Sequence, residues 1–278
     1  ISAVGASIQP IDPDPRTYNV SAEAIDDAIT PNTRAILPVH MYGLPTELDH
    51  IADVAKTHQL KLIEDAAQAH GARVHDRRIG SHSHATCWSF YPGKNLGAMG
   101  DAGAVTTNDK EIAEKIRLFG NYGSVRKYIN RLRGINSRLD PLQAAILRVK
   151  LAHLDDWNDR RRKIACIYNQ MLRDSEITLP RVPEGLSPSW HLYPVSTARR
   201  DTLQQHLAHD GISTLIHYPI PPHMQKAYSD LKIAPECLPV ARRIAENTLS
   251  LPISPHLTDE EAERVGSRII AFLASGTE

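Results

Sequence analysis

The sequence of 278 residues lacks several features that would point to a particular class of protein. Basic and acidic residues number 32 each, so the zero formal charge gives no electrostatic argument for binding nucleic acid or an anionic membrane. No apolar run approaches the roughly eighteen residues of a spanning helix, and no secretion signal opens the chain. The three cysteines form no CxxC pair, which predicts reduced thiols rather than disulfides. These observations predict a cytoplasmic α/β enzyme.

A strand–helix–strand pattern in the first half predicts a parallel sheet. Residues 34–40 form an apolar run in which Pro38 is awkward for a central strand. Residues 46–59 repeat apolar side chains at helical spacing, and residues 60–63 form a second buried run. Such a unit implies parallel strands joined by a right-handed crossover. Further elements are expected as strands at 85–91 and 102–107 and as a helix at 109–119.

A long helical pattern separates the two halves of the chain. Apolar residues at spacings of three and four over 141–172 predict one very long helix, or two helices joined by a kink. We place a domain boundary there, which gives a large domain at 1–152 and a smaller α+β domain at 153–278. In the second domain we expect strands at 190–197 and 212–216, and helices at 201–209, 237–249 and 258–273.

An acidic and a basic side chain follow two of the expected strands. Asp65 comes where the strand at 60–63 ends, and Lys94 follows the strand at 85–91 by three residues. Ligands bind at the carboxyl ends of strands in open parallel sheets, so both side chains should project into one crevice. They could form a salt bridge. They could also be the lysine and carboxylate that pyridoxal phosphate requires. Spacing alone does not decide between these alternatives.

The sequence words around these residues resemble a known family. They are IEDAAQAHG at 63–71, SFYPGKNLG at 89–97, GDAGA at 100–104, FGNYGS at 119–124 and GINSRLDPLQAA at 134–145. Together, and in this order, they are similar to the DegT/DnrJ/EryC1/StrS family of sugar aminotransferases. The resemblance implies the aspartate-aminotransferase-like fold of type I pyridoxal-phosphate enzymes. It also implies a homodimer whose active sites are built from both subunits.

The resemblance assigns roles to five residues in cofactor binding. Lys94 matches the lysine that bonds covalently to pyridoxal phosphate and moves the substrate proton, and Asp65 matches the partner of the pyridine nitrogen. Gln68 matches the residue at the cofactor ring or its phenolic oxygen, and Ser89 matches a phosphate ligand. Asn121 matches the asparagine that reaches the cofactor phosphate of the partner subunit. Ser89 could instead be an ordinary strand hydroxyl, and Asn121 could belong to a turn.

A narrower likeness concerns the substrate. YGSVRKYIN at 122–130 and HYPIPPH at 217–223 resemble the members that aminate C3 of dTDP-3-keto-6-deoxyhexoses. A sugar nucleotide brings a diphosphate, which requires cations and hydrogen-bond donors. Lys127, Tyr128 and Arg138 are the candidates, although a solvated loop of mixed charge would look the same. We expect His217 and Tyr91 to line the sugar pocket. L-glutamate is the expected amino donor.

Two other patterns predict no site. His75, His82 and His84 could suggest a metal, but no acidic or thiol ligand stands at a structural spacing. The basic run at 160–163 is flanked by aspartates, so we interpret it as a solvated, self-paired helix face.

Two rivals to an aminotransferase remain. A sugar dehydratase of the same family would carry histidine in place of the lysine, which Lys94 argues against. A non-catalytic cofactor-binding protein or a remnant is the other, since relatives usually have a further N-terminal stretch before the position of Ile1. If the 278 residues were the whole protein, we would expect weak cofactor binding. We interpret the 278 residues as part of a longer enzyme that is active.

Overall fold

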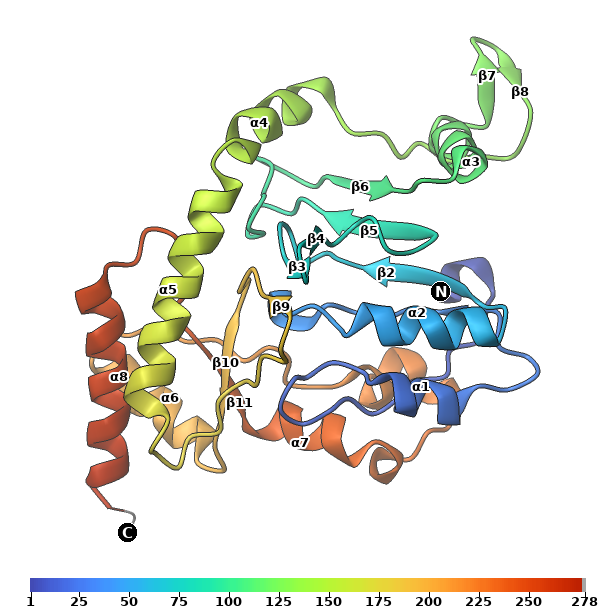
Figure 1. The fold of residues 1–278 in the computed structure, drawn as a ribbon. Helices are drawn as coiled ribbons and strands as arrows, with labels where there is room; N and C mark the ends of the chain where they lie inside the picture. Colours follow the sequence, from blue (N-terminus) through green and yellow to red (C-terminus); the bar gives the residue numbers. More distant parts are fainter. Residues whose placement is uncertain (277–278) are drawn as a thin grey trace.

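The computed structural model describes residues 1–276, and it places a four-stranded sheet in the first half of the chain (Figure 1). The strand order is β1-β2-β5-β6. The first three strands are parallel and β6 runs antiparallel to β5, so the sheet is mixed and mostly parallel. The expected α/β sheet is confirmed. Its strands are β1 (Ala35–Ile36), β2 (Lys61–Asp65), β5 (Ala85–Ser89) and β6 (Gly103–Thr106).

The first strand is shorter than predicted. β1 covers two residues of the expected 34–40, because Pro38 has no N–H to donate to the ladder. The chain nevertheless stays beside β2. The carbonyl of Pro38 accepts from Asp65 N at 2.9 Å, and Val39 forms an isolated bridge with Asp65.

Helices cover this sheet much as the periodicity predicts. α2 (Leu48–Thr57) joins β1 to β2 and buries Leu48, Ile51 and Ala55. α3 (Lys110–Gly120) follows β6, and the Asp109 side chain caps it by accepting from two backbone N–H groups. The sequence did not predict α1 (Ala22–Ala28), a short helix that packs against α2.

The long helical pattern corresponds to two helices. α4 (Pro141–Leu151) and α5 (Leu154–Leu172) are separated at Ala152 and His153, which confirms a break in the pattern. α4 buries only Leu147, whereas α5 buries residues along its length. Most of the apolar surface of α4 is therefore left exposed in a single chain, whereas that of α5 is covered.

The C-terminal half packs helices around a two-stranded antiparallel sheet of β10 (Tyr193–Ser196) and β11 (Thr248–Leu251). The expected helix at 237–249 was partly wrong, because it gives way to β11 at Thr248. The expected strand at 212–216 is reduced to one bridge between Leu215 and Ser250. The helices are α6 (Arg200–His209), α7 (Pro239–Asn247) and α8 (Asp259–Ala274).

Several short elements complete the fold. β7 and β8 form a projecting hairpin, and β3, β4 and β9 form a small sheet. The strands are β3 (Arg73–Val74), β4 (Arg77–Arg78), β7 (Ser124–Arg126), β8 (Ile129–Asn130) and β9 (Leu186–Ser187). The 3-10 helices are η1 (Ser2–Val4), η2 (Met41–Gly43), η3 (Pro222–Met224), η4 (Lys226–Leu231) and η5 (Pro235–Cys237).

The buried apolar residues form separate clusters. The largest lies between residues 164 and 272, and three smaller ones lie between residues 22 and 154. The division into 1–152 and 153–278 stays a proposal. The N-terminal segment also reaches the second half, where the Asp12 carboxylate accepts from Val240 N and Ala241 N at 2.8 Å each.

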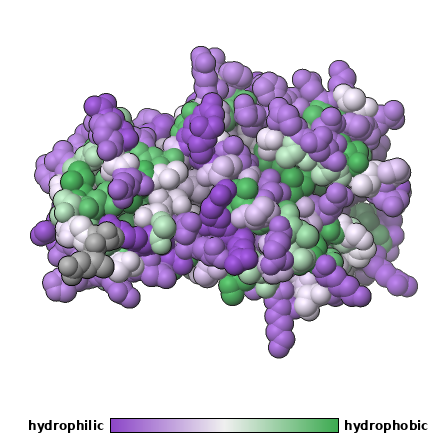
Figure 2. Space-filling view, turned by 90° about the horizontal axis from the view of Figure 1, so that it is seen from below, coloured by the Kyte–Doolittle hydropathy of each residue, from purple (hydrophilic) through white to green (hydrophobic). Residues whose placement is uncertain are grey.

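The lower face is mostly polar, with apolar side chains in separated patches (Figure 2). Among residues 1–276, no helix combines the length and apolar character needed to cross a membrane.

Candidate active site

Asp65 and Lys94 come from neighbouring parallel strands. Asp65 is the last residue of β2, and Lys94 follows the end of β5 in a turn that the Lys94 N–H closes onto Tyr91 O at 2.9 Å. The carboxyl ends of both strands face the α5 side of the sheet (Figure 1). The two side chains are close enough for the Asp65 carboxylate to act on the pKa of Lys94. The structure therefore places the two residues together at the carboxyl ends of the parallel strands, which form the carboxyl edge of the sheet.

The environment of Lys94 favours its uncharged form. Burial lowers the pKa of Lys94, and the negative charge of Asp65 opposes that effect only in part. The Asp65 carboxylate is itself held, because its Oδ1 accepts from Ala67 N at 3.0 Å. An amine with a lowered pKa is a better nucleophile and proton acceptor near neutral pH.

Three histidines surround this lysine, and two of them were not predicted as site residues. Burial first, and then the positive charge of Lys94, lowers the pKa of His70 to about 4 and that of His191 to about 3. The same two causes lower the pKa of His217, which was predicted for the sugar pocket. All three rings are therefore neutral near pH 7. His70 lies within the stretch 63–71 and His191 within the expected strand 190–197, but nothing else in the sequence marked either residue as part of a site.

Gln68 lies in a hydrogen-bonded chain that joins the two halves of the protein. Its Oε1 accepts from Tyr42 N at 2.6 Å and its Nε2 donates to Tyr218 Oη at 3.0 Å. The Tyr42 hydroxyl donates to His217 O at 2.5 Å. The His217 ring is within 2.9 Å of the Ser250 hydroxyl. Sequence reasoning missed Tyr42 and Tyr218, because neither role has a local signal.

Ser89 and Tyr91 also lie at this edge of the sheet. Ser89 ends β5, is half-buried, and accepts from Tyr91 N at 3.3 Å, which leaves its hydroxyl proton to donate elsewhere. The Tyr91 side chain is 58% exposed, so it is open to a ligand.

The other predicted substrate residues form a second, separate group. Arg138 Nη1 donates to Asn121 Oδ1 at 2.9 Å, and the Lys127 amine lies 5.2 Å from the centre of the Tyr128 ring. Asn121, Lys127 and Tyr128 line a concavity at the β7–β8 hairpin. The hairpin lies on the side of the sheet opposite to the ends of β2 and β5 (Figure 1). Within one chain, the structure does not bring these residues to Lys94.

The match to known proteins covers nearly the whole chain. Residues 1–270 match the DegT/DnrJ/EryC1/StrS aminotransferase family. The chain belongs to this family. It is 50% identical over 277 residues to the erythromycin biosynthesis sensory transduction protein EryC1 of Saccharopolyspora erythraea, covering 99% of this chain and 75% of that protein. It is 48% identical to the dTDP-3-amino-3,4,6-trideoxy-alpha-D-glucose transaminase of Streptomyces venezuelae, with coverage of 95% and 70%.

A solved structure gives the same result for this aminotransferase. DesV of S. venezuelae, determined in complex with a ketimine intermediate, superposes with a TM-score of 0.97 at 47% identity. The match covers 100% of this chain and 75% of that one. The aspartate-aminotransferase-like large-domain fold expected from the sequence is therefore confirmed.

The residues at the carboxyl edge fit pyridoxal phosphate. Lys94 provides an amine of lowered pKa for a covalent bond, and Asp65 provides a carboxylate that can hold a protonated ring nitrogen. The Ser89 hydroxyl is free to donate to a phosphate oxygen. His70, more than nine-tenths buried near Lys94, has no hydrogen-bond partner on either ring nitrogen among the described residues.

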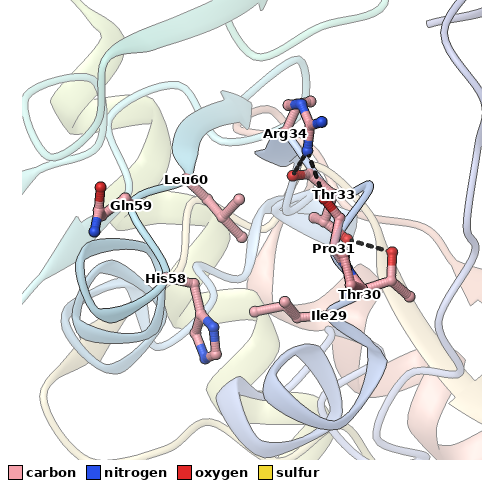
Figure 3. A pocket seen from close by; sticks show the side chains of 8 residues that line it. All are labelled: Ile29, Thr30, Pro31, Thr33, Arg34, His58, Gln59 and Leu60. Carbon is pink, nitrogen blue, oxygen red and sulfur yellow. Dashed lines mark hydrogen bonds between the residues drawn. The ribbon is translucent and has the colours of Figure 1, made fainter.

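A separate pocket of the aminotransferase, lined by residues of the segments 29–34 and 58–60, carries no comparable chemistry (Figure 3). It lies before β1 and β2, at the opposite ends of the strands from Asp65. Several polar groups of its wall already have partners: Arg34 donates to Pro31 O and Thr33 O, and the hydroxyls of Thr30 and Thr33 are 3.3 Å apart.

The structure also shows the surroundings of the histidine pattern and of the basic run. No group of three potential metal ligands occurs among residues 1–276, and His84 Nδ1 instead accepts from Leu62 N at 3.1 Å. In the basic run, Arg160 and Lys163 pair with Asp259. Arg161 contradicts the prediction of a solvated face. It is buried, donates to Trp190 O and Ile253 O, and burial lowers its pKa to about 10.

Proposed function

We propose that this protein is a pyridoxal-phosphate-dependent aminotransferase that transfers an amino group from L-glutamate to the keto group of a dTDP-linked deoxysugar. The observation that carries this proposal is the Lys94 amine, of lowered pKa, beside the Asp65 carboxylate at the carboxyl edge of the sheet. Family membership supports the reaction class. The names of the trideoxyglucose transaminase and of the DesV complex support a sugar substrate.

The cofactor and the protein have distinct roles in this reaction. When bound, pyridoxal phosphate supplies an electron sink for the negative charge that develops on the substrate carbon. Lys94 Nζ accepts and returns the proton that moves between substrate and cofactor carbons, which requires an uncharged amine. Asp65 keeps the pyridine nitrogen protonated. Ser89 holds the phosphate, and Gln68, fixed by Tyr42 and Tyr218, lies at the ring.

We place the sugar pocket between the two halves of the chain. His217 and Tyr91 border Lys94 from opposite parts of the sequence, and Tyr218 joins His217 to Gln68. The histidines near Lys94 are neutral, so they can donate or accept hydrogen bonds with sugar hydroxyls without adding charge.

We propose that the hairpin group serves a second copy of the chain. Asn121, Lys127, Tyr128 and Arg138 lie away from Lys94 of their own chain, yet they offer the cations and donors that a diphosphate requires. Apolar residues of α4, which follows the hairpin along the chain, are exposed, with Leu142 at 72%. A homodimer would cover them and would bring each hairpin to the partner's site.

We also place the reaction in the cytoplasm. All three cysteines are free and exposed, which suits a reducing compartment.

Replacing Lys94 tests the proposal. Lys94→Ala should lower transamination between glutamate and a dTDP-keto-deoxysugar by about three orders of magnitude or more, because the covalent anchor and the proton carrier are lost together. Product formation is measured by chromatography of the nucleotide sugars. Lys56→Ala, on the exposed face of α2, is the matched control and should act as wild type. Substantial activity in Lys94→Ala would refute the assignment.

A further inference from the structure

The turn that carries Lys94 is anchored by the next residue. Asn95 is only 5% exposed, so its amide must find partners inside the protein. Its Nδ2 donates to Asn158 Oδ1 at 2.9 Å and to Ser189 O at 2.8 Å. Both partners are oxygen atoms, which fixes the orientation of the Asn95 amide. The turn after β5 is therefore tied to α5 and to the segment before β10.

Asn158 extends this connection to a second loop of the site. It lies on α5, is 1% exposed, and donates from Nδ2 to His70 O at 2.8 Å. Gly71, at φ +79°, makes room for this contact, because a Cβ at that position would lie 2.6 Å from Asn158 Nδ2. His70 is two residues from Gln68. Two buried amides thus link the turn of Lys94 to the loop that follows Asp65.

The Asn95 side chain also determines which ring nitrogen of His191 carries the proton. Asn95 Oδ1 lies 3.3 Å from His191 Nδ1, and a carbonyl oxygen can only accept. The proton of the neutral imidazole is therefore on Nδ1, which leaves Nε2 as an acceptor. His191 stays neutral near pH 7, because burial and Lys94 lower its pKa to about 3. Asn95 thus orders a neutral ring beside the reactive amine.

We propose that Asn95, held by Asn158, is a positioning residue that fixes the Lys94 amine and the His191 tautomer for proton transfer. This inference rests on the proposed function in taking Lys94 as the reactive amine. Of the other hydrogen bonds of this turn, Lys94 N to Tyr91 O and Ala98 N to Phe90 O join backbone to backbone, and Lys150 Nζ donates to Gly97 O; Asn95 supplies the side-chain contacts to Asn158 and Ser189. Without the buried amide, we expect the turn to open to water. Misplacing a reacting group by about 1 Å can slow catalysis by roughly a hundredfold.

The test compares Asn95→Ala with Asn169→Ala. Asn169 lies on the same helix, α5, but accepts from Tyr193 Oη at 2.6 Å, away from the Lys94 turn. First, Lys94 of the cofactor-free protein is acetylated with acetic anhydride at a series of pH values, and the modified peptide is measured by mass spectrometry. Second, kcat and KM for transamination are measured separately with the loaded enzyme.

In Asn95→Ala, the pH midpoint of Lys94 labelling should rise by about half a unit or more, because burial no longer lowers its pKa as strongly. The kcat should fall about tenfold while KM changes less than about twofold, since positioning acts on the chemical step. Asn169→Ala should show neither change. The double variant Asn95→Ala/Asn158→Ala should be no worse than the single one, because both belong to one network.

Unchanged labelling and kcat in Asn95→Ala would overturn the proposal, and so would equal changes in Asn169→Ala. If Asn95→Ala does not fold, Asn158→Ala takes its place with the same expectations, because it removes the same hydrogen bond from the α5 side. The two tests can also give different answers. If the wild-type protein has no transaminase activity, the proposed function fails. A labelling shift seen only in the Asn95 and Asn158 variants would still support the positioning role.

Discussion

Lys94 lies among groups whose influences oppose one another. Burial lowers the pKa of Lys94, whereas the negative charge of Asp65 raises it. The three neighbouring histidines remain neutral because each would have to gain charge in a buried place beside a cation. Asp65 is thus the charged group that acts on the pKa of Lys94, and in our proposal it also pairs with the ring nitrogen of the cofactor.

His70 gives a prediction at this scale. Its pKa is about 4 when folded and near 6.5 when unfolded, so the unfolded state binds a proton first as the pH falls. Its contribution to the free energy of unfolding is complete above pH 6.5 and declines between pH 6.5 and 4, by an amount on the order of 3 kcal/mol. His70→Phe, between the rings of Trp88 and Phe90, should weaken this acid dependence.

Urea unfolding at pH 7 and pH 5 measures the difference between the two proteins. His209→Gln is the matched control, since the side chain of His209 is 91% exposed. The account is contradicted if His70→Phe and wild type lose the same free energy between the two pH values.

At the scale of elements, the last helix illustrates a local signal that the fold retains. The sequence Thr-Asp-Glu-Glu predicts a capped start, and α8 begins with a capping box in which Thr258 Oγ1 accepts from Glu261 N at 3.1 Å and Glu261 Oε2 accepts from Thr258 N at 2.8 Å. α8 packs against α5 and buries Val265 and Ile269 in the C-terminal core. Its start therefore contributes to the stability of the second half.

Thr258→Ala removes this cap. We expect it to lower the free energy of unfolding by about 1 kcal/mol, because the N–H of Glu261 loses its partner. Ser267→Ala, in the middle of α8, is the control, since its hydroxyl only bonds back to Glu263 O and alanine favours helix. Thermal unfolding followed by circular dichroism gives both values. A loss in Ser267→Ala as large as that in Thr258→Ala would argue against a capping effect.

The elements that sequence reasoning missed depend on distant partners. β11 continues directly from α7 without a helix-breaking residue, so the apolar pattern at 237–249 does not separate a helix from a buried strand. Its strand character comes from pairing with β10. Tyr42 and Tyr218 likewise gain their roles only when the fold brings them to Gln68. The neighbouring positions of Lys94 and Asp65 could be predicted, because Asp65 ends β2 and Lys94 lies in the turn that follows β5.

At the scale of the whole molecule, the predicted site residues divide into two groups. One surrounds Lys94, and the other lies on the β7–β8 hairpin. The sequence could not place the second group, because spacing along a chain does not tell which copy of the chain a hairpin faces. Exposed apolar residues on α4, including Leu142 and Val149, lie in the stretch that follows this hairpin. Both facts support a dimer with shared sites.

Charges on α4 test the dimer. Wild type should scatter light as a particle near twice the 30.9 kDa of one chain. The double variant Leu142→Glu/Val149→Glu should shift toward one chain and lose at least about tenfold in activity, because charges are costly in an apolar interface and the hairpins are withdrawn. Ile270→Glu, on the exposed part of α8, should change neither. A monomeric wild type with full activity would contradict shared sites.

The central claim is that Lys94 bonds to the cofactor opposite Asp65. The most direct measurement mixes the purified protein with pyridoxal phosphate, records its visible spectrum, reduces it with borohydride, and maps the modified peptide by mass spectrometry. We predict a visible band that disappears on reduction and a pyridoxyl group on Lys94. The absence of a band, or a label on another lysine with Lys94 unmodified, would contradict the account.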